Sequence, residues 1–338
     1  MEPRTAIVTG ASHGIGAYIA RALAARGMNL LLVARSEDEL RRLAAELRTP
    51  QVTVVVAAVD LAGRQAAQQV TEAARGMNLL LVARSEDELR RLATELRTRE
   101  VTVAVTAVDL AGRQAARQVA EAARAELGHA DVLVNNAATE PQTRFHVLTP
   151  AEIEDVLQVD LISPLLLGRL LLPGMLERGY GRIINVSSLA GHTSFPHTEA
   201  YAAAKDGLTA FSRVLTSDYR GTGVSATSLI LGPVKDAGVT TRTLAETGLT
   251  ASTAFSVPPE KVTAAVLRAI RKPTAEIVVS VGPGRFLKAL MDYFPGLGPA
   301  INRLSGATKL MASVADHREA QRTTSEPQGR AVPGARTR

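Results

Sequence analysis

Three residues in the middle of the chain have the types and spacing of a proton-transfer site. Tyr201 and Lys205 lie four residues apart, which places a phenol and an ammonium on one face of a predicted helix. Ser188 lies thirteen residues before Tyr201, at the end of an apolar run that we interpret as a strand. A free tyrosine has a pKa of about 10, and a neighbouring ammonium lowers it. A tyrosine tuned in this way would exchange a proton at neutral pH, although a tyrosine and a lysine at this spacing are by themselves usually only a surface pair.

A glycine-rich loop near the N-terminus predicts a dinucleotide site. The loop follows an apolar strand at 5–9, precedes an amphipathic helix at 15–26, and consists of Gly10, Ala11, Ser12, His13, Gly14, Ile15 and Gly16. Glycines let a pyrophosphate approach the backbone, and a helix N-terminus offers unpaired N–H groups and partial positive charge. A glycine cluster alone is also compatible with a plain tight turn, but its position between the first strand and a helix favours nucleotide binding.

The end of the second predicted strand bears on the choice of cofactor. An acidic residue there would bind the ribose 2′-hydroxyl of NAD, but this chain has Ala34 followed by Arg35. A guanidinium suits bidentate binding of a 2′-phosphate, and His13 offers a further donor. The alternative is that Arg35 is merely solvated at the start of a helix. We predict NADP(H), with NAD(H) as the alternative, because the missing acid removes repulsion of the phosphate in either case.

The elements that must position these residues alternate along the chain as apolar runs and helical segments. This pattern predicts an α/β fold with one Rossmann-like, doubly wound parallel sheet covered by helices on both faces. We expect this single domain to span 1–285, with a helical extension at 286–316 that packs on the core or caps a dimer. Residues 317–338 are polar and rich in proline and glycine, which predicts a disordered tail.

A nearly exact tandem repeat interrupts this pattern. Residues 26–74 recur as 75–123 with 42 of 49 positions identical, and Ala-Ala-Arg stands at each seam. Two near-identical units in an otherwise non-repeating chain indicate a recent duplication, since solenoid repeats usually diverge more and need about three units.

Together, these features resemble the short-chain dehydrogenase/reductase family over about residues 5–285. Three further motifs carry the resemblance: Asn135-Asn136-Ala137-Ala138 after the fourth family strand, the segment 181–188 that ends at Ser188, and Gly232-Pro233-Val234 after the sixth. Each motif alone is weak, but their number and order make chance agreement very improbable.

The resemblance implies a role for each matching residue. Tyr201 would be the general acid, or the base in the oxidative direction, while Lys205 would tune it and bind the nicotinamide ribose and Ser188 would hold the substrate oxygen. The residues that would bind the phosphates, ribose, adenosine and carboxamide of the cofactor are Gly10, Ser12, His13, Gly14, Ile15, Gly16, Asn136 and Val234. The family also implies a homodimer or homotetramer.

Four positions depart from the family pattern. Asp160 occupies the place of the usual catalytic asparagine, whose backbone carbonyl holds a relay water, so activity can survive, but a carboxylate near Lys205 would alter the tuning of the tyrosine. Ala138, Leu231 and Asp236 replace residues near the cofactor, which weakens the inference of tight cofactor binding.

The duplication leaves two candidates for the adenosine end of the site. Adding both copies to the sheet would stretch the return crossover from three strand spacings to five, roughly 24 Å instead of 14 Å at 4.8 Å each. We therefore expect one copy in the family position and the other appended at the edge or poorly packed. Because 30–35 directly follows the first helix, we expect Arg35 and Asp60 at the site, with Arg84 and Asp109 as the alternatives.

Composition narrows the classes of function. The absence of cysteine excludes a disulfide scaffold, a thiolate zinc site and a cysteine nucleophile, and we expect no metal site. A net charge of +6 with only 3% aromatic residues disfavours nucleic-acid binding. The apolar stretch 161–176 contains two prolines and an arginine and is too short to span a bilayer, so we expect no membrane partner and a cytoplasmic protein.

The sequence thus predicts an NADP(H)-dependent oxidoreductase that interconverts a ketone and a secondary alcohol. The segment 236–256, where the family carries its variable substrate lid, is rich in Thr, Ala and Leu and indicates a modestly apolar small-molecule substrate. The alternative is a catalytically impaired, duplicated relative that binds nucleotide or partners without turnover.

Overall fold

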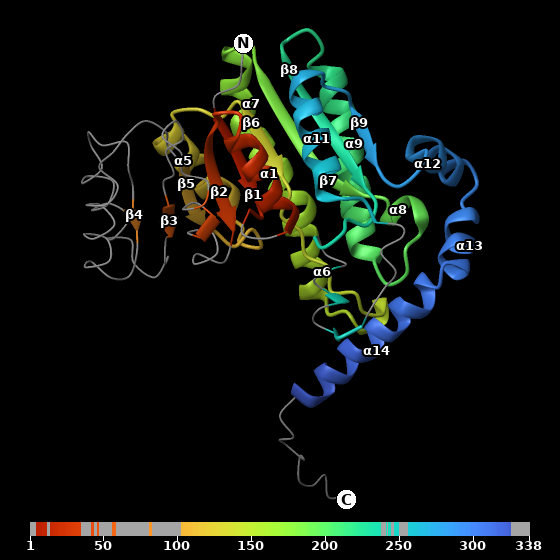
Figure 1. Ribbon diagram of the computed structural model, residues 1–338. Helices are drawn as coiled ribbons and strands as arrows, with labels where there is room; N and C mark the ends of the chain where they lie inside the picture. The colour runs from red at the N-terminus through yellow and green to blue at the C-terminus, as the bar shows by residue number, and fades with distance from the viewer. Residues whose placement is uncertain are drawn as a thin grey trace, which may run out of the picture.

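One parallel sheet organises the chain (Figure 1). The computed structural model describes residues 5–11, 14–34, 42–43, 46, 56–58, 81–82, 103–237, 241, 243–244, 247–249 and 256–325. Within these residues the strand order is β4-β3-β5-β2-β1-β6-β7-β8-β9. The strands are β1 (Thr5–Thr9), β2 (Asn29–Ala34), β3 (Val56–Ala58), β4 (Leu81–Val82), β5 (Val103–Ala107), β6 (Val132–Asn135), β7 (Gly181–Ser188), β8 (Val224–Leu231) and β9 (Glu276–Val279). The predicted doubly wound α/β fold is confirmed.

Helices cover both faces of the sheet, which is why its central strands are apolar on both sides. The helices are α1 (Gly14–Ala24), α5 (Ala115–Leu127), η1 (Phe145–Val147), α6 (Pro150–Leu157), η2 (Gln158–Ile162), α7 (Ser163–Glu177), α8 (Ala190–Thr193), α9 (Glu199–Asp218), α11 (Pro259–Arg271), α12 (Gly284–Tyr293), α13 (Leu297–Leu304) and α14 (Ala307–Ser325). Alternate residues of β1 separate two buried clusters: Ala6 and Val8 pack with α1 and α11, and Ile7 packs with α5 and α7.

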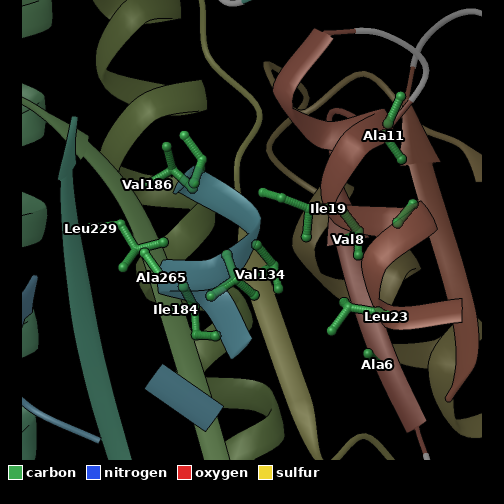
Figure 2. Packing of buried hydrophobic residues seen from close by; sticks show 14 of the residues in the cluster. Ala6, Val8, Ala11, Ile19, Leu23, Val134, Ile184, Val186, Leu229 and Ala265 are labelled. Carbon is green, nitrogen blue, oxygen red and sulfur yellow. The ribbon is translucent and has the colours of Figure 1, made fainter. Parts of the chain in front are cut away.

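The α1 and α11 side of the core is closely packed (Figure 2). Ile19 and Leu23 of α1 lie beside β1, and Ala265 of α11 lies over the strands in the middle of the sheet. Because this core fixes α1 behind β1, it also fixes the glycine loop that joins them.

A continuous helix runs through the apolar stretch, although the stretch contains two prolines. α6, η2 and α7 follow one another without a break, and η2 is a π-helical turn that contains Asp160. The combined helix is long and apolar enough to cross a membrane by length and composition, so the expectation that this stretch is too short is wrong. Core helices meet the same criterion, and Leu167 and Met175 are fully buried against the sheet.

The two repeat copies contribute one strand each to the centre of the sheet. β2, from the first copy, pairs with β1, and β5, from the second copy, pairs with β2. The two remaining strands lie outside β5, where Ala57 pairs with Thr106, the residue 49 positions later in the repeat. The pairing of Leu81 with Val56 in turn repeats the register of Leu32 with Val105. One strand of each copy is therefore appended at the edge, and the expectation that one whole copy is appended there is wrong.

We expected the first copy to supply the two strands that follow β1 on the side of β2. This expectation is wrong for the outer of the two strands, which is β5 of the second copy. Because β3 and β4 lie beyond β5, the return crossover through α5 spans only β2 and β1 before it reaches β6, and the three strand spacings of the family are kept. Asp109, which follows β5, therefore takes the position that we predicted for Asp60. Asp60 itself lies outside the described residues.

The C-terminal region is helical further than its composition predicted. α14 continues to Ser325, so the expectation of a disordered tail is wrong for 317–325, and 326–338 lie outside the described residues. The polar side chains of this helix bind the body of the protein: Glu319 pairs with Arg144 at 2.6 Å, and Arg322 pairs with Glu152 at 2.5 Å. These contacts explain why a polar segment is ordered without a large apolar face.

Candidate active site

The three predicted catalytic residues lie on two elements, β7 and α9. Ser188 is the last residue of β7, and its Oγ accepts a hydrogen bond from the backbone N–H of Ala190 at 3.1 Å. α9 carries Tyr201 in its first turn and Lys205 one turn later. The Lys205 Nζ lies 5.4 Å from the centroid of the Tyr201 ring, so the ammonium and the phenol are neighbours, as their spacing predicted.

A buried polar network fastens α9 to the sheet below it. Ser187 Oγ donates to the backbone oxygen of Lys205 at 2.8 Å and contacts Thr209 Oγ1 at 3.0 Å, and Thr209 in turn contacts Ser228. Buried hydrogen bonds of this kind are costly to break, because each leaves a polar group unsatisfied. They hold Lys205 at a fixed height relative to Ser188, the neighbour of Ser187.

Asp160 lies directly against Lys205. Its Oδ2 is 3.5 Å from Lys205 Nζ, and the exposed fractions of the two side chains are 0% and 2%. The π-helical turn brings this carboxylate out of the regular helical register and into the site, a use of π turns that is common at functional sites. Its Oδ1 accepts the backbone N–H of Thr139 at 2.8 Å, which ties η2 to the loop after β6.

Sequence reasoning missed a second buried acid, Glu140, on that same loop. The pKa of its carboxyl is raised to about 8, mainly by burial and then by the negative charge of Asp160, against the opposing effects of a hydrogen bond from Gln142 and the charges of Arg318 and Lys205. A single glutamate in a loop carries no sequence signal. Only its placement against Asp160 distinguishes it.

The described glycines of the loop, Gly10, Gly14 and Gly16, form a cradle that fits a dinucleotide. Gly10 has a φ of +63° and Gly14 a φ of +50°, conformations that favour glycine. A β-carbon on Gly16 would lie 2.1 Å from the carbonyl oxygen of Gly10, so the backbone packs where no side chain fits. This close approach, at the N-terminus of α1, provides the N–H groups and the access that a pyrophosphate needs. Ile15 is partly buried against the core.

Two polar residues hold the cradle in place. Asn136 Nδ2 donates to the backbone oxygens of Thr9 and Gly10 at 3.1 Å and 3.2 Å. Thr9 Oγ1, which sequence reasoning missed, accepts the backbone N–H groups of Asn136 and Ala137 at 3.0 Å and 3.1 Å. The described contacts of Asn136 thus hold the loop, and its predicted contact with adenosine stays a prediction.

The remaining predicted cofactor residues divide into two groups. Val234 is buried, and its segment is bound to Val257, whose N–H donates to Pro233 O and whose oxygen accepts from Lys235 N, both at 2.9 Å. Ser12, His13 and Arg35 lie outside the described residues.

Among the residues that the structure does describe, no three His, Asp or Glu side chains are grouped so as to hold a metal ion.

The chain matches a family of known proteins. A family model described as short chain dehydrogenase matches residues 4–75 and again 71–247. The chain belongs to this family. The two matches overlap at residues 71–75, next to the seam between the repeat copies. As a short chain dehydrogenase, the protein is an oxidoreductase that acts on CH–OH or C=O groups with NAD(P).

Curated short chain dehydrogenases resemble the chain over most of its length. The ketoacyl reductase HetN of Nostoc sp. is 29% identical over 287 residues, which cover 83% of this chain and 79% of HetN. The D-beta-hydroxybutyrate dehydrogenase of Cupriavidus necator is 28% identical over 69% of this chain and 71% of its own. A human very-long-chain 3-oxoacyl-CoA reductase is 30% identical, and the match covers 67% of this chain and 57% of that enzyme.

Solved structures of the family share the fold. A metagenomic short-chain oxidoreductase in complex with NADP is 27% identical and superposes with a TM-score of 0.55 over 82% of this chain and 96% of its own. A short-chain dehydrogenase from Streptomyces avermitilis, 23% identical, superposes with a TM-score of 0.60 over 90% of this chain and 97% of its own.

Proposed function

We propose that the protein is an NADP(H)-dependent oxidoreductase that interconverts a ketone and a secondary alcohol, with Tyr201 as the general acid and base. The observation that carries this proposal is the buried Lys205 ammonium beside the Tyr201 ring, on a helix fastened to the strand that ends at Ser188. Bound NADPH supplies the hydride. Tyr201 donates its phenolic proton to the oxygen as negative charge develops there, and Ser188 orients that oxygen by a hydrogen bond.

The cofactor preference rests on Arg35. β2 lies beside β1, so the residue after Ala34 follows the strand next to the glycine cradle, where short chain dehydrogenases bind the adenosine ribose. In the sequence, Arg84 comes two residues after the end of β4, and β4 is the strand at the far edge of the sheet. We therefore expect Arg35→Ala to weaken NADPH binding about tenfold while NADH binding changes little, and Arg84→Ala serves as the matched control. Equal effects of the two substitutions on the Kd of NADPH would refute this assignment.

Similarity suggests a substrate class within ketones. The relatives described above are named for a ketoacyl, a 3-oxoacyl-CoA and a 3-hydroxybutyrate substrate, and each of these carries its oxo or hydroxy group close to an acid or thioester carbonyl. We propose a 3-oxoacyl substrate with a modestly apolar chain. A panel of 3-oxoacyl thioesters, 3-oxo acids and simple ketones of matched length, assayed by NADPH consumption, tests the class. Faster turnover of the simple ketones would contradict it.

A titration with NADPH, together with this substrate panel, tests the alternative of an impaired, nucleotide-binding relative. NADPH binding without turnover of any member of the panel, and with no difference between the wild type and Tyr201→Phe, would favour the alternative. The intact set of Ser188, Tyr201 and Lys205 favours the enzyme.

A homodimer or homotetramer and a cytoplasmic location stay predictions. Large apolar side chains on η2, α7 and α9 support self-association, because their outer faces expose Ile162, Leu166, Leu170 and Val214. Light scattering of the purified chain measures the oligomeric state.

A further inference from the structure

The loops that follow β6 and β8 leave the sheet on either side of β7, the strand that ends at Ser188. β7 lies between β6 and β8, and Ser188 is in register with Leu231, the last residue of β8. The three strands are parallel, so both loops lie at one edge of the sheet, where ligands of open α/β sheets bind. A substrate whose oxygen is bound by Ser188 would therefore have one of these loops on each side.

The loop after β8 has a closed neck. The backbone N–H of Lys235 donates to the oxygen of Val257 at 2.9 Å, which brings together the two ends of the predicted substrate lid, 236–256. Within the lid, Thr247 Oγ1 donates to the backbone oxygen of Thr243 at 2.8 Å. Bonds of these two kinds do not fix where the body of the lid lies relative to the rest of the protein. The position of the lid therefore depends on its contacts with other elements.

Arg318 of α14 binds both loops at once. Its Nη2 donates to Oγ1 of Thr243 in the lid at 3.3 Å. Its Nη1 donates to the backbone oxygens of Glu140, at 3.3 Å, and Pro141 in the loop after β6. Thr243 is only 2% exposed, so water does not compete for its hydroxyl. A guanidinium is a rigid, planar fork, and here one side chain joins the loops that follow the two strands beside β7.

The loop after β6 is the fixed side of this bridge. The N–H of Thr139 donates to Asp160 Oδ1 at 2.8 Å, and Asp160 Oδ2 lies 3.5 Å from Lys205 Nζ. Gln142 and Thr143, further along the loop, are buried. Because this loop is tied to the buried ion pair, the guanidinium holds the lid at a defined position relative to α9.

The helix α14 fixes the backbone from which Arg318 reaches the two loops. Met311, Val314 and Ala315 are at most 2% exposed, and their spacing of three and four residues places them on the same helix face as Arg318. α14 lies at one end of the molecule, near α6 (Figure 1). It also lies beyond residue 247, where the match to the family model ends, so the family pattern assigns it no role.

We propose that Arg318 is a positioning residue that fastens the lid to the loop after β6 and so sets how closely the two loops enclose the substrate. The inference rests on the proposed ketone reduction. Arg318 acts on binding, because a loosened lid leaves the apolar chain of the substrate in contact with water. A ketone that has bound still meets the same Ser188 and Tyr201. The effect should grow with chain length, because a longer apolar chain has more surface to cover.

Arg318→Ala tests this role with two substrates of different length. We expect the KM of the 3-oxooctanoyl thioester of N-acetylcysteamine to rise about tenfold, since the lid loses hydrogen bonds to a charged group. The KM of the 3-oxobutanoyl thioester, the kcat for both and the Kd of NADPH should change by less than about twofold.

Arg322→Ala is the matched control, because Arg322 is one turn further along α14 and binds Glu152 and the backbone of Val147 instead of the lid. It should lower the Tm without changing either KM. An unchanged KM in Arg318→Ala, or the same rise in both variants, overturns the inference.

Thr243 tests the same contact from the lid. Thr243→Val keeps the shape of the side chain and removes the acceptor, so it should raise the KM of the longer thioester. Thr243→Ser keeps the hydroxyl and should restore the wild-type KM. In the double variant with Arg318→Ala, the two effects should not add, because both substitutions remove one contact. The Val and Ser pair decides the matter if Arg318→Ala does not fold, and a wild-type KM in Thr243→Val overturns the inference.

Amide hydrogen exchange of the full chain tests the clamp without requiring turnover. We expect the lid to exchange at least about tenfold faster in Arg318→Ala and Thr243→Val than in the wild type, since a lid that is not fastened opens more often. Arg322→Ala should exchange in the lid as the wild type does.

Exchange and kinetics together separate the inference from the proposed function. Turnover of the thioesters with lid exchange and KM values that are the same in all variants overturns the inference. Faster lid exchange in Arg318→Ala, in a protein that reduces no ketone, overturns the proposed function, while the clamp between α14 and the lid stands.

Discussion

Gly16 packs so closely on the carbonyl oxygen of Gly10 that a β-carbon at position 16 would lie 2.1 Å from it. Real β-carbons do not approach a backbone oxygen this closely, so any side chain there must displace the loop that carries the predicted phosphate-binding N–H groups.

We therefore expect Gly16→Ala to raise the Kd of NADPH at least about tenfold, since the helix N-terminus would no longer face the pyrophosphate. Fluorescence titration of NADPH measures the effect. Gly296→Ala is the matched control, because nothing lies within 4 Å of a β-carbon at that position and its φ is ordinary. Unchanged affinity in Gly16→Ala would mean that the cradle does not bind the cofactor.

Tyr201→Phe removes the proposed proton donor and leaves the ring in place. General acid–base catalysis contributes about 10² to 10⁴-fold, so kcat should fall within that range while the Kd of NADPH stays within about twofold. Steady-state kinetics and NADPH titration of the same preparation provide the two values. Tyr219→Phe, at the other end of α9, should keep wild-type kcat. Comparable losses in both variants would remove Tyr201 from its proposed role.

The repeat makes a structure-guided deletion possible. Leu43 of the first copy is buried in the core beside α1, and Glu46 pairs with Arg21 of α1 at 2.5 Å, while β5 comes from the second copy. Deleting 50–98 removes β3 and β4 and joins the helix of the first copy to the strand of the second.

We expect this 49-residue deletion to keep NADPH affinity and turnover, with a Tm equal to or above that of the full chain. Calorimetry and the reductase assay check both properties. Loss of folding would show that the appended strands are needed to cover the edge of β5.

Contacts of α14 with the loop after β6 should contribute to stability. Glu319 accepts from Arg144 at 2.6 Å and from the backbone N–H of Arg144 and the hydroxyl of Thr143 at 3.2 Å. Partly exposed ion pairs are weak, so Glu319→Gln should lower the free energy of unfolding by about 1 kcal/mol. Urea denaturation measures this change, and Glu177→Gln, exposed on α7, provides the comparison. No difference between the two would indicate that α14 contributes little to the stability of the body.

Glu140 should also make stability depend on pH in a defined direction. Its folded pKa of about 8 lies above its ordinary value of 4.5, so the folded protein retains a proton that the unfolded chain releases. The resulting stabilisation is fully present below about pH 4.5 and is lost as the pH rises to about 8, at no more than about 1.4 kcal/mol per pH unit. Thermal melts across this range should show a smaller decline for Glu140→Gln than for the wild type. Parallel curves would contradict the raised pKa.

The sequence by itself determined the local chemistry and the class of fold. Apolar runs between helices required a parallel sheet, and the four-residue spacing of Tyr201 and Lys205 placed their side chains on one helix face. These inferences hold because helix and strand periodicity depend only on neighbours along the chain.

Only the tertiary structure decided that the strand beside β2 comes from the second copy, with Asp109, and not from the first copy, with Asp60. The sequence could not decide this, because 42 identical positions give the two copies nearly the same local preferences. The short crossover from β5 to β6 favours the second copy. In the same way, Glu140 and Arg318 are ordinary polar residues in sequence, 178 positions apart. They became part of one site when η2, α9 and α14 packed around a single loop and excluded water from the carboxyl. Burial and electrostatic coupling depend on neighbours in space, which no local pattern records.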